Sequence, residues 1–115
     1  YERALVLQWL FFEQYSHEPH IATNRFWIHI AGQAEEQAKL LARNHPKGVA
    51  ALGVMDTHLS SQSLFVAGCY TVADIALYAY THVAHEGGYD LGEFPNVSRW
   101  LNDVRDQARH IPITA

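Results

Sequence analysis

The segment 72–84 constrains the fold of this chain more than any other part, because it is apolar almost throughout. Asp74 is its one charged residue, and Thr81 and His82 are polar. A helix that is apolar nearly all round is buried on all sides. A small helical domain has room for one such helix at its centre. The segment therefore predicts a central buried helix at about 71–85, placed in a ring of amphipathic helices.

The start of this helix carries a signal of its own in Thr71-Val72-Ala73-Asp74. The Thr71 hydroxyl can accept the N–H of Asp74, and the Asp74 carboxylate can accept the N–H of Thr71, which together make a capping box. Tyr70 precedes the cap and Ile75 is the fourth helical residue, so these two are placed as a hydrophobic staple. The alternative is an ordinary helix start, because the same pattern often occurs by chance.

The rest of the chain is also predicted to be helical, since apolar residues recur at helical spacing. Leu5, Trp9 and Phe12 lie on one face of the first helix, and Pro19 is expected to end or kink it. The expected helices beside the central one cover residues 2–16, 21–31, 33–44, 48–60 and 95–108. No segment alternates like a strand over a useful length, which makes the predicted class all-α.

Two segments are expected to interrupt the helices. His45-Pro46-Lys47-Gly48 reads as a break, and the apolar run 64–67 reads as a buried extended link because a lone strand has no partner. Trp9, Trp27 and Trp100 are expected to be packing residues.

The second and third helical stretches carry two finer expectations. Phe26, Trp27 and Ile30 are expected to form the apolar face of the second stretch. Glu35 and Lys39 are expected to form a favourable i, i+4 pair on the exposed third helix.

The bulk properties fit one helical domain over residues 1–115. The formal net charge of -4 argues against nucleic acid and gives no support for a basic membrane-binding face. Cys69 is the single cysteine, so no disulfide within the chain can stabilise the fold. No apolar run reaches the length of a membrane span. We therefore expect a cytoplasmic protein with no membrane contact. The first residue is Tyr1 rather than methionine, which indicates a piece of something longer.

Three motifs resemble one known family when they are taken together and in order. They are Phe65-Val66-Ala67-Gly68-Cys69-Tyr70-Thr71-Val72-Ala73-Asp74, the later Phe94-Pro95-Asn96-Val97-Ser98-Arg99-Trp100-Leu101, and the opening Trp9-Leu10-Phe11-Phe12-Glu13-Gln14-Tyr15-Ser16-His17-Glu18-Pro19. The first looks like the C-terminal signature of glutathione transferases, the second like the next helix of that domain, and the third like the first C-domain helix of bacterial members. The resemblance covers nearly the whole chain.

The resemblance implies a division of labour. An N-terminal thioredoxin-like domain, absent from this chain, would bind the co-substrate glutathione and carry the group that activates its thiol. The helical domain would form the wall of the pocket for a small hydrophobic electrophile and would contribute contacts to a homodimer. The chain alone is therefore expected to be inactive.

The resemblance also indicates which residues would face the electrophile. The candidates are Phe12, Tyr15, His17, His82 and Val83. For the polar residues near Pro19 the alternative is that they cap a kinked helix. For Val83 the alternative is an ordinary core position.

The eight histidines raise the question of a metal site. His82, His85 and Glu86 could lie near one face of a helix end, and two histidines with a carboxylate are compatible with zinc. The usual H-E-x-x-H spacing is absent, and Pro19 lies between His17 and His20, so no metal is expected. Cys69 is expected to be an inert buried cysteine.

Three hypotheses for the function remain open at this stage. The leading one is a glutathione-dependent transferase acting on a small apolar electrophile. The second is a non-catalytic module of the same fold that assembles with protein partners. The third is a helical bundle with an unrelated enzymatic activity.

Overall fold

The computed structural model describes residues 1–107, and their regular structure is helical apart from one isolated bridge between Val66 and Cys69. This confirms the predicted all-α class. In chain order the elements are α1 (Glu2–Phe12), the π-helical turn η1 (Glu13–His17), α2 (Glu18–Arg25), the π-helical turn η2 (Phe26–Ile30), α3 (Ala38–Leu59), α4 (Val72–Thr81), the 3₁₀ turns η3 (Ala84–Gly87) and η4 (Leu91–Glu93), and α5 (Pro95–Arg105). The last expected helical residue, Ala108, lies outside the described part.

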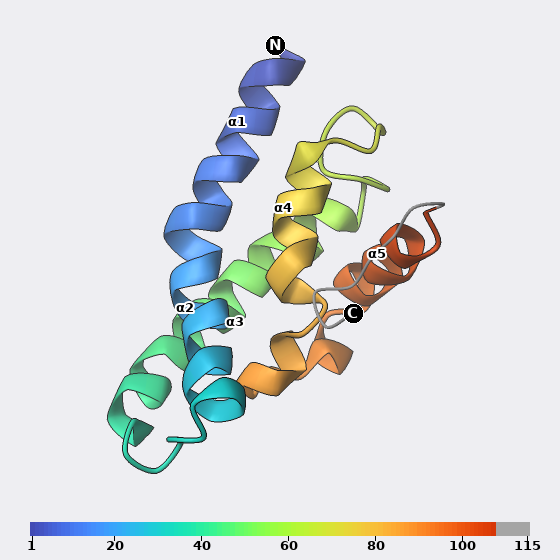
Figure 1. Cartoon of the computed structure of the whole chain (residues 1–115). Coiled ribbons are helices and arrows are strands. Elements are labelled where there is room, and N and C mark those ends of the chain that lie inside the picture. The colour runs from blue at the N-terminus through green and yellow to red at the C-terminus, as the bar shows by residue number, and fades with distance from the viewer. Residues whose placement is uncertain (108–115) are drawn as a thin grey trace.

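The helices form a bundle with α4 near its centre (Figure 1). α4 packs against α1, α2 and α5, while α3 packs against α2 and α5. Ala73 and Leu77 on α4 are fully buried, as the apolar segment predicted. The expectation of burial on all sides is wrong, however, because Val72 and Ile75 are 52% and 57% exposed. Apolar composition does not say how many sides the neighbours cover.

Of the predicted end or kink at Pro19, the helix end is wrong, because the first helix passes this residue without ending. Helical backbone continues from α1 through η1 into α2. In a regular α-helix the Pro19 ring would clash with the carbonyl four residues earlier. The widened turn η1 ends at His17, two residues before Pro19, and Glu18 donates its N–H to the carbonyl of Glu13, five residues back. The prolyl residue is thus accommodated by one π turn.

The same turn keeps one side of the long helix against the core. Trp9 packs against the core cluster, Glu13 is 5% exposed, and His17 and Ile21 are fully buried. These positions recur every four residues, and a step of four overshoots one turn of an α-helix by about 40°. A widened turn between Glu13 and His17 removes part of this drift. The four side chains therefore stay on one face.

The apolar face expected for the second stretch is wrong. Phe26 and Ile30 are 45% and 59% exposed, whereas Ile21 and Asn24 are buried. The core contacts of this helix are made in α2, before η2 begins. The expected Glu35–Lys39 helical pair is also wrong, because α3 begins only at Ala38.

The predicted break at 45–48 is absent, because α3 runs through Pro46 without interruption. Tertiary contacts hold the helix at this point. Asn44 donates through Nδ2 to Oδ1 of Asn24 at 3.2 Å, and Asn24 donates to the Tyr89 hydroxyl at 3.3 Å. A Cβ built on Gly48 would overlap the Tyr89 ring, so only glycine fits there. Burial raises the pKa of Tyr89 to about 12.

The capping box at the start of α4 is confirmed. The Asp74 carboxylate accepts the N–H of Thr71 at 3.0 Å, and the Thr71 hydroxyl oxygen accepts the N–H of Ala73 at 3.2 Å. Tyr70 and Ile75, the pair placed as a hydrophobic staple, are 43% and 57% exposed, so any contact between them lies at the surface.

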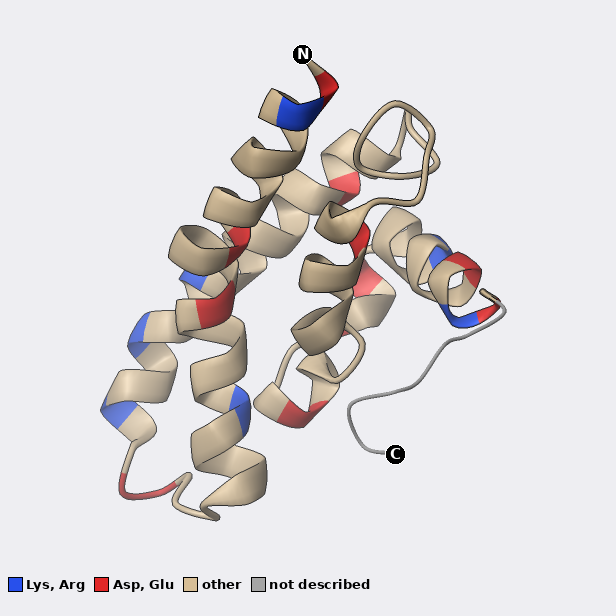
Figure 2. Cartoon of the chain, turned by 45° about the horizontal axis from the view of Figure 1, so that its top comes forward, with Lys and Arg blue, Asp and Glu red and all other residues tan. Residues whose placement is uncertain are grey.

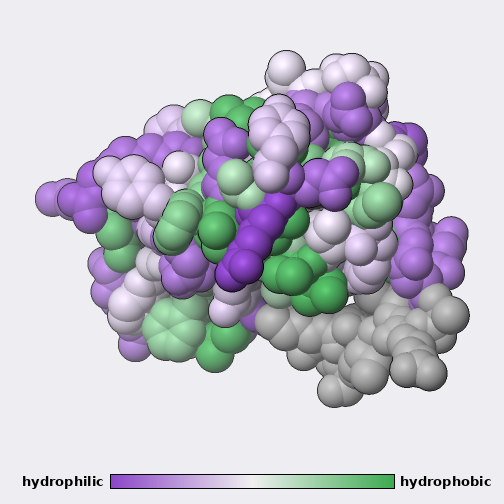
Figure 3. Space-filling model, turned by 90° about the horizontal axis from the view of Figure 1, so that it is seen from above, coloured by the Kyte–Doolittle hydropathy of each residue, from purple (hydrophilic) through white to green (hydrophobic). Residues whose placement is uncertain are grey.

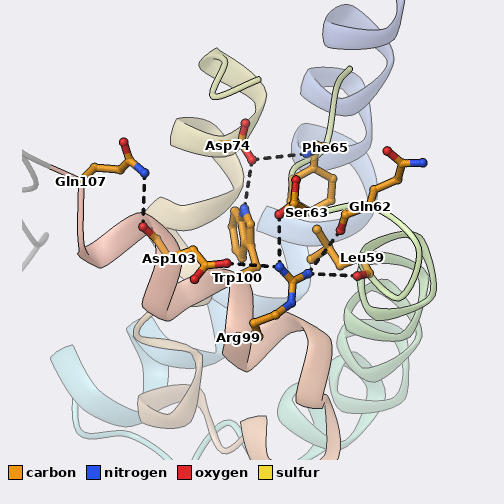
Figure 4. A network of polar contacts seen from close by, with 9 residues as sticks. All are labelled: Leu59, Gln62, Ser63, Phe65, Asp74, Arg99, Trp100, Asp103 and Gln107. Carbon is orange, nitrogen blue, oxygen red and sulfur yellow. Dashed lines mark hydrogen bonds and ion pairs between the residues drawn. The ribbon is translucent and has the colours of Figure 1, made fainter. Parts of the chain in front are cut away.

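Asp74 also joins two more segments to α4 (Figure 4). Its Oδ1 accepts the indole N–H of Trp100 at 2.9 Å and the N–H of Phe65 at 3.4 Å. Phe65 and Val66 are each 2% exposed, which confirms the middle of the predicted buried link. Ala67 and Cys69 are exposed, so the expected burial is wrong for these two residues. Trp100 is therefore more than a packing residue.

The helices α3 and α5 cap one another. Asp56 on α3 accepts the N–H groups of Asn96 and Val97 at 2.8 and 3.0 Å, at the start of α5. Arg99 on α5 donates to the carbonyl of Leu59, the last residue of α3, at 3.0 Å, and its contacts with the following loop are drawn in Figure 4. Unpaired N–H and C=O groups at helix ends are thus satisfied by side chains distant in sequence.

Replacing Asp74 with alanine should lower the free energy of unfolding by about 2–4 kcal/mol, because it leaves buried N–H donors without an acceptor. Asp103→Ala is the control, since the Asp103–Arg99 pair lies at the surface and its loss should cost no more than about 0.5 kcal/mol. Urea unfolding of both variants at equal slope measures the difference. Equal losses in the two variants would show that the Asp74 network does not hold the fold.

Candidate functional site

An open groove lies between the long first helix and α3. It has a volume of about 270 Å³ and is walled mainly by apolar side chains. Tyr15 is 84% exposed beside it, while Phe12 is partly buried. The small side chains of Ala50 and Ala51 leave the space open on the α3 side. The full lining is Phe12, Tyr15, Ser16, His20, Lys47, Ala50, Ala51 and Val54.

A few polar groups interrupt the apolar wall of the groove. His20 contacts the carbonyl of Ser16 through Nδ1 at 2.8 Å. A carbonyl only accepts, so Nδ1 carries the hydrogen and Nε2 is left as an acceptor in the neutral ring. Lys47 adds one cation and the Tyr15 hydroxyl one donor. Apolar walls with few polar groups are typical of sites for small molecules.

The opposite face of the same helix carries a buried polar cluster. His17 is fully buried, and its Nε2 lies 2.7 Å from the hydroxyl oxygen of Thr81 on α4. Glu13 Oε1 lies 3.8 Å from Nδ1 of His17, and Gln14 donates to the other oxygen of Glu13 at 2.7 Å. Burial alone would raise the pKa of Glu13, but the His17 ring and the Gln14 amide lower this pKa below its usual value of 4.5.

The structure brings together only two of the five residues expected to face a ligand. Phe12 and Tyr15 share the groove, while His17 lies behind it in the core. Val83 is 4% exposed at the end of α4. His82 is partly exposed and contacts the backbone carbonyl of Tyr78 through Nδ1 at 2.9 Å. The His82 ring also stacks on the ring of Tyr78.

Sequence reasoning missed the α3 side of the groove, because it placed a break where α3 is continuous. Lys47 falls in the predicted break, and Ala50, Ala51 and Val54 fall in the expected helix 48–60 without being named as candidates. The helical side had a usable signal, since Phe12, Ser16 and His20 are spaced by four and share one face.

The metal alternative gains no support in the described residues. Glu86 pairs with Arg25 at 3.4 Å and also contacts His29, rather than joining His82 and His85. Within residues 1–107, no three His, Cys, Asp or Glu side chains lie together in a way that could hold a metal ion.

The model of the "Glutathione S-transferase, C-terminal domain" family matches residues 7–108. The chain belongs to the glutathione S-transferase family and corresponds to the C-terminal domain of its members. A curated relative, glutathione S-transferase D7 of Drosophila melanogaster, is 31% identical over 103 residues, which are 90% of this chain and 44% of the relative.

Solved glutathione S-transferases share this fold. The enzyme from Pseudomonas fluorescens Pf-5 is 47% identical with a TM-score of 0.95, over 99% of this chain and 57% of that one. Ure2p5 from Phanerochaete chrysosporium, cocrystallised with 1-(S-glutathionyl)-2,4-dinitrobenzene, is 24% identical with a TM-score of 0.78, over 92% of this chain and 51% of that one. The chain thus spans about half the length of the relatives that it matches.

Lysine and arginine residues occur on several helices (Figure 2), and three of them, Lys39, Arg43 and Lys47, are spaced by four at exposed positions of α3. Of the helices in the described part, none is long and apolar enough to cross a membrane.

The lowered pKa of Glu13 predicts a stability that depends on pH. Because the pKa is lower in the folded state, the carboxylate stabilises the fold above the usual glutamate pKa, and this contribution is lost as the pH falls through the lowered value. Glu13→Gln should be less stable than the parent at neutral pH, and the gap should shrink as the pH falls from 4.5 through the lowered pKa.

Urea unfolding across pH would measure this gap. Glu2→Gln, at an exposed position on α1, is the matched control and should show no such change. A Glu13→Gln curve that stays parallel to the parent curve down to acid pH would contradict the assignment.

Proposed function

We propose that this chain is the C-terminal helical domain of a glutathione transferase, in which the groove beside Tyr15 forms part of the pocket wall for a small hydrophobic electrophile. In this proposal an N-terminal thioredoxin-like domain of the same protein binds glutathione. That domain also carries the group that activates the thiol. The observation that carries the proposal is an apolar groove with an exposed aromatic residue, in a chain of this family.

The chemistry of the groove supports an apolar ligand with a polarised group. Phe12, Ala50 and Val54 offer apolar surface, which favours a hydrophobic ring or chain. Tyr15 can stack on such a ring and can also donate a hydrogen bond from its hydroxyl. Such a ligand is compatible with the dinitrobenzene conjugate of glutathione that was cocrystallised with Ure2p5.

No thiol-activating residue is assigned in this chain, so residues 1–115 alone should not accelerate conjugation of glutathione to 1-chloro-2,4-dinitrobenzene.

In the longer protein, Tyr15→Ala should raise KM for the electrophile about 3- to 10-fold, because one aromatic contact is lost, and leave KM for glutathione within about twofold. Phe26→Ala, an exposed aromatic outside the groove, is the control.

Steady-state kinetics with each substrate varied in turn would separate the two KM values. A rate for the isolated chain well above the uncatalysed one would overturn the proposed division of labour. Equal kinetic effects of Tyr15→Ala and Phe26→Ala would remove the groove from the electrophile site.

We also propose that the first helix contributes to a homodimer. Leu7 and Phe11 on α1 are 43% and 71% exposed, and hydrophobic side chains reach the surface at the end of the molecule seen in Figure 3.

Phe11→Asp should therefore weaken self-association, because it places a charge in an apolar contact. Ile30→Asp, at another exposed apolar position on η2, should leave association unchanged. Sedimentation velocity over a wide concentration series would measure both. A parent chain that stays monomeric throughout would contradict the dimer and favour the alternative, a module that assembles with other proteins.

A further inference from the structure

The buried cluster behind the groove has a defined hydrogen-bond direction. The Thr81 hydroxyl lies 2.6 Å from the carbonyl of Leu77, one turn earlier on α4, and can only donate to it. Its oxygen is thereby left as the acceptor for the His17 ring at 2.7 Å. His17 therefore donates from Nε2, and the chain of donors runs from His17 through Thr81 to Leu77.

This direction leaves the second nitrogen of His17 facing a carboxylate. Nδ1 is fully buried, has no hydrogen-bond partner among the described residues, and lies 3.8 Å from Oε1 of Glu13. Glu13 and His17 are the first and last residues of η1. The side chains at the two ends of the widened turn therefore lie next to each other, and the turn is joined to α4 by the Nε2 hydrogen bond.

The turn so fixed carries the groove residues on its other side. Tyr15 and Ser16 lie between Glu13 and His17 in sequence and line the groove, where Tyr15 is 84% exposed. Exposed positions have few contacts of their own to hold them. A π turn within a helix is intrinsically less favourable than the α-helix around it and is often found at functional sites. Besides Pro19, which the widened turn accommodates, η1 is joined to α4 by the His17–Thr81 hydrogen bond on the buried side.

We infer that His17 is a positioning residue for the groove: its Nε2–H bond to Thr81 holds the π turn that presents Tyr15 and Ser16 to a ligand. The inference rests on the proposed function for what the groove binds. The positioning itself is a property of the turn and can be measured without any ligand.

Thr81→Val tests the bond, because valine keeps the shape of threonine and removes the acceptor. Amide hydrogen exchange of residues 13–18 should become about tenfold faster, which corresponds to roughly 1.4 kcal/mol of local opening. Thr81→Ser, which restores the hydroxyl, should return the exchange to the parent rate. Val104→Ala, which leaves a space in the core at α5, is the control for a loss of global stability.

The exchange pattern decides the matter. The inference holds if Thr81→Val opens residues 13–18 more than its loss of global stability explains, and Val104→Ala does not. It is overturned if Thr81→Val and Val104→Ala raise exchange in η1 only in proportion to global stability. It is also overturned if nitrogen NMR of the histidine rings shows that His17 carries its hydrogen on Nδ1 alone.

Kinetics of the longer protein give a second measurement. Thr81→Val should raise KM for the electrophile about 3- to 10-fold, with kcat and KM for glutathione within about twofold, and Thr81→Ser should match the parent. An unchanged KM for the electrophile would overturn the link between His17 and the groove. If the longer protein without substitutions conjugates no electrophile, the proposed function fails. The hydrogen-exchange measurements still decide whether His17 positions the turn.

Discussion

The buried carboxylate of Asp74 is the interaction on which the arrangement of the central helix depends. It is fully buried and accepts N–H groups from Thr71, Phe65 and Trp100 at 3.0, 3.4 and 2.9 Å. A buried carboxylate without such donors is strongly unfavourable. The donors come from the start of α4, from the preceding link and from α5. Satisfying this one charge therefore requires all three segments to be in place, which couples local capping to tertiary structure.

Local rules predicted the parts of the fold that local forces determine. The capping box needs only two residues, Thr71 and Asp74, within four consecutive positions, and it is present. The two prolines were misjudged, because their effect depends on distant contacts. Pro46 lies inside α3, and this part of α3 is held by hydrogen bonds that link Asn44 through Asn24 to Tyr89. Pro19 follows a π turn that no spacing rule predicts. The bond from Trp100 to Asp74 crosses 26 positions and was equally invisible to local patterns.

The groove was predictable on one side only. Phe12 and Tyr15 were named from the resemblance of the first helix, and both line the groove. Its other wall needed the packing of α3 against the first helix, and the predicted break at 45–48 removed Lys47 from any helix. His17 was assigned to the ligand because it is polar and lies near Tyr15. In a helix two residues apart point in different directions, so Tyr15 is exposed while His17 is buried.

The first helix therefore has two faces with different requirements. Its inner face must satisfy Glu13 and His17, two polar groups that are buried beside α4. Its outer face presents Tyr15, for which exposure leaves few contacts that could fix its position. Both faces belong to one turn, so the geometry of the exposed side is set by the hydrogen bond on the buried side. In this chain the chemistry of the groove depends on its lining side chains, while the shape of the turn depends on the His17–Thr81 pair behind it.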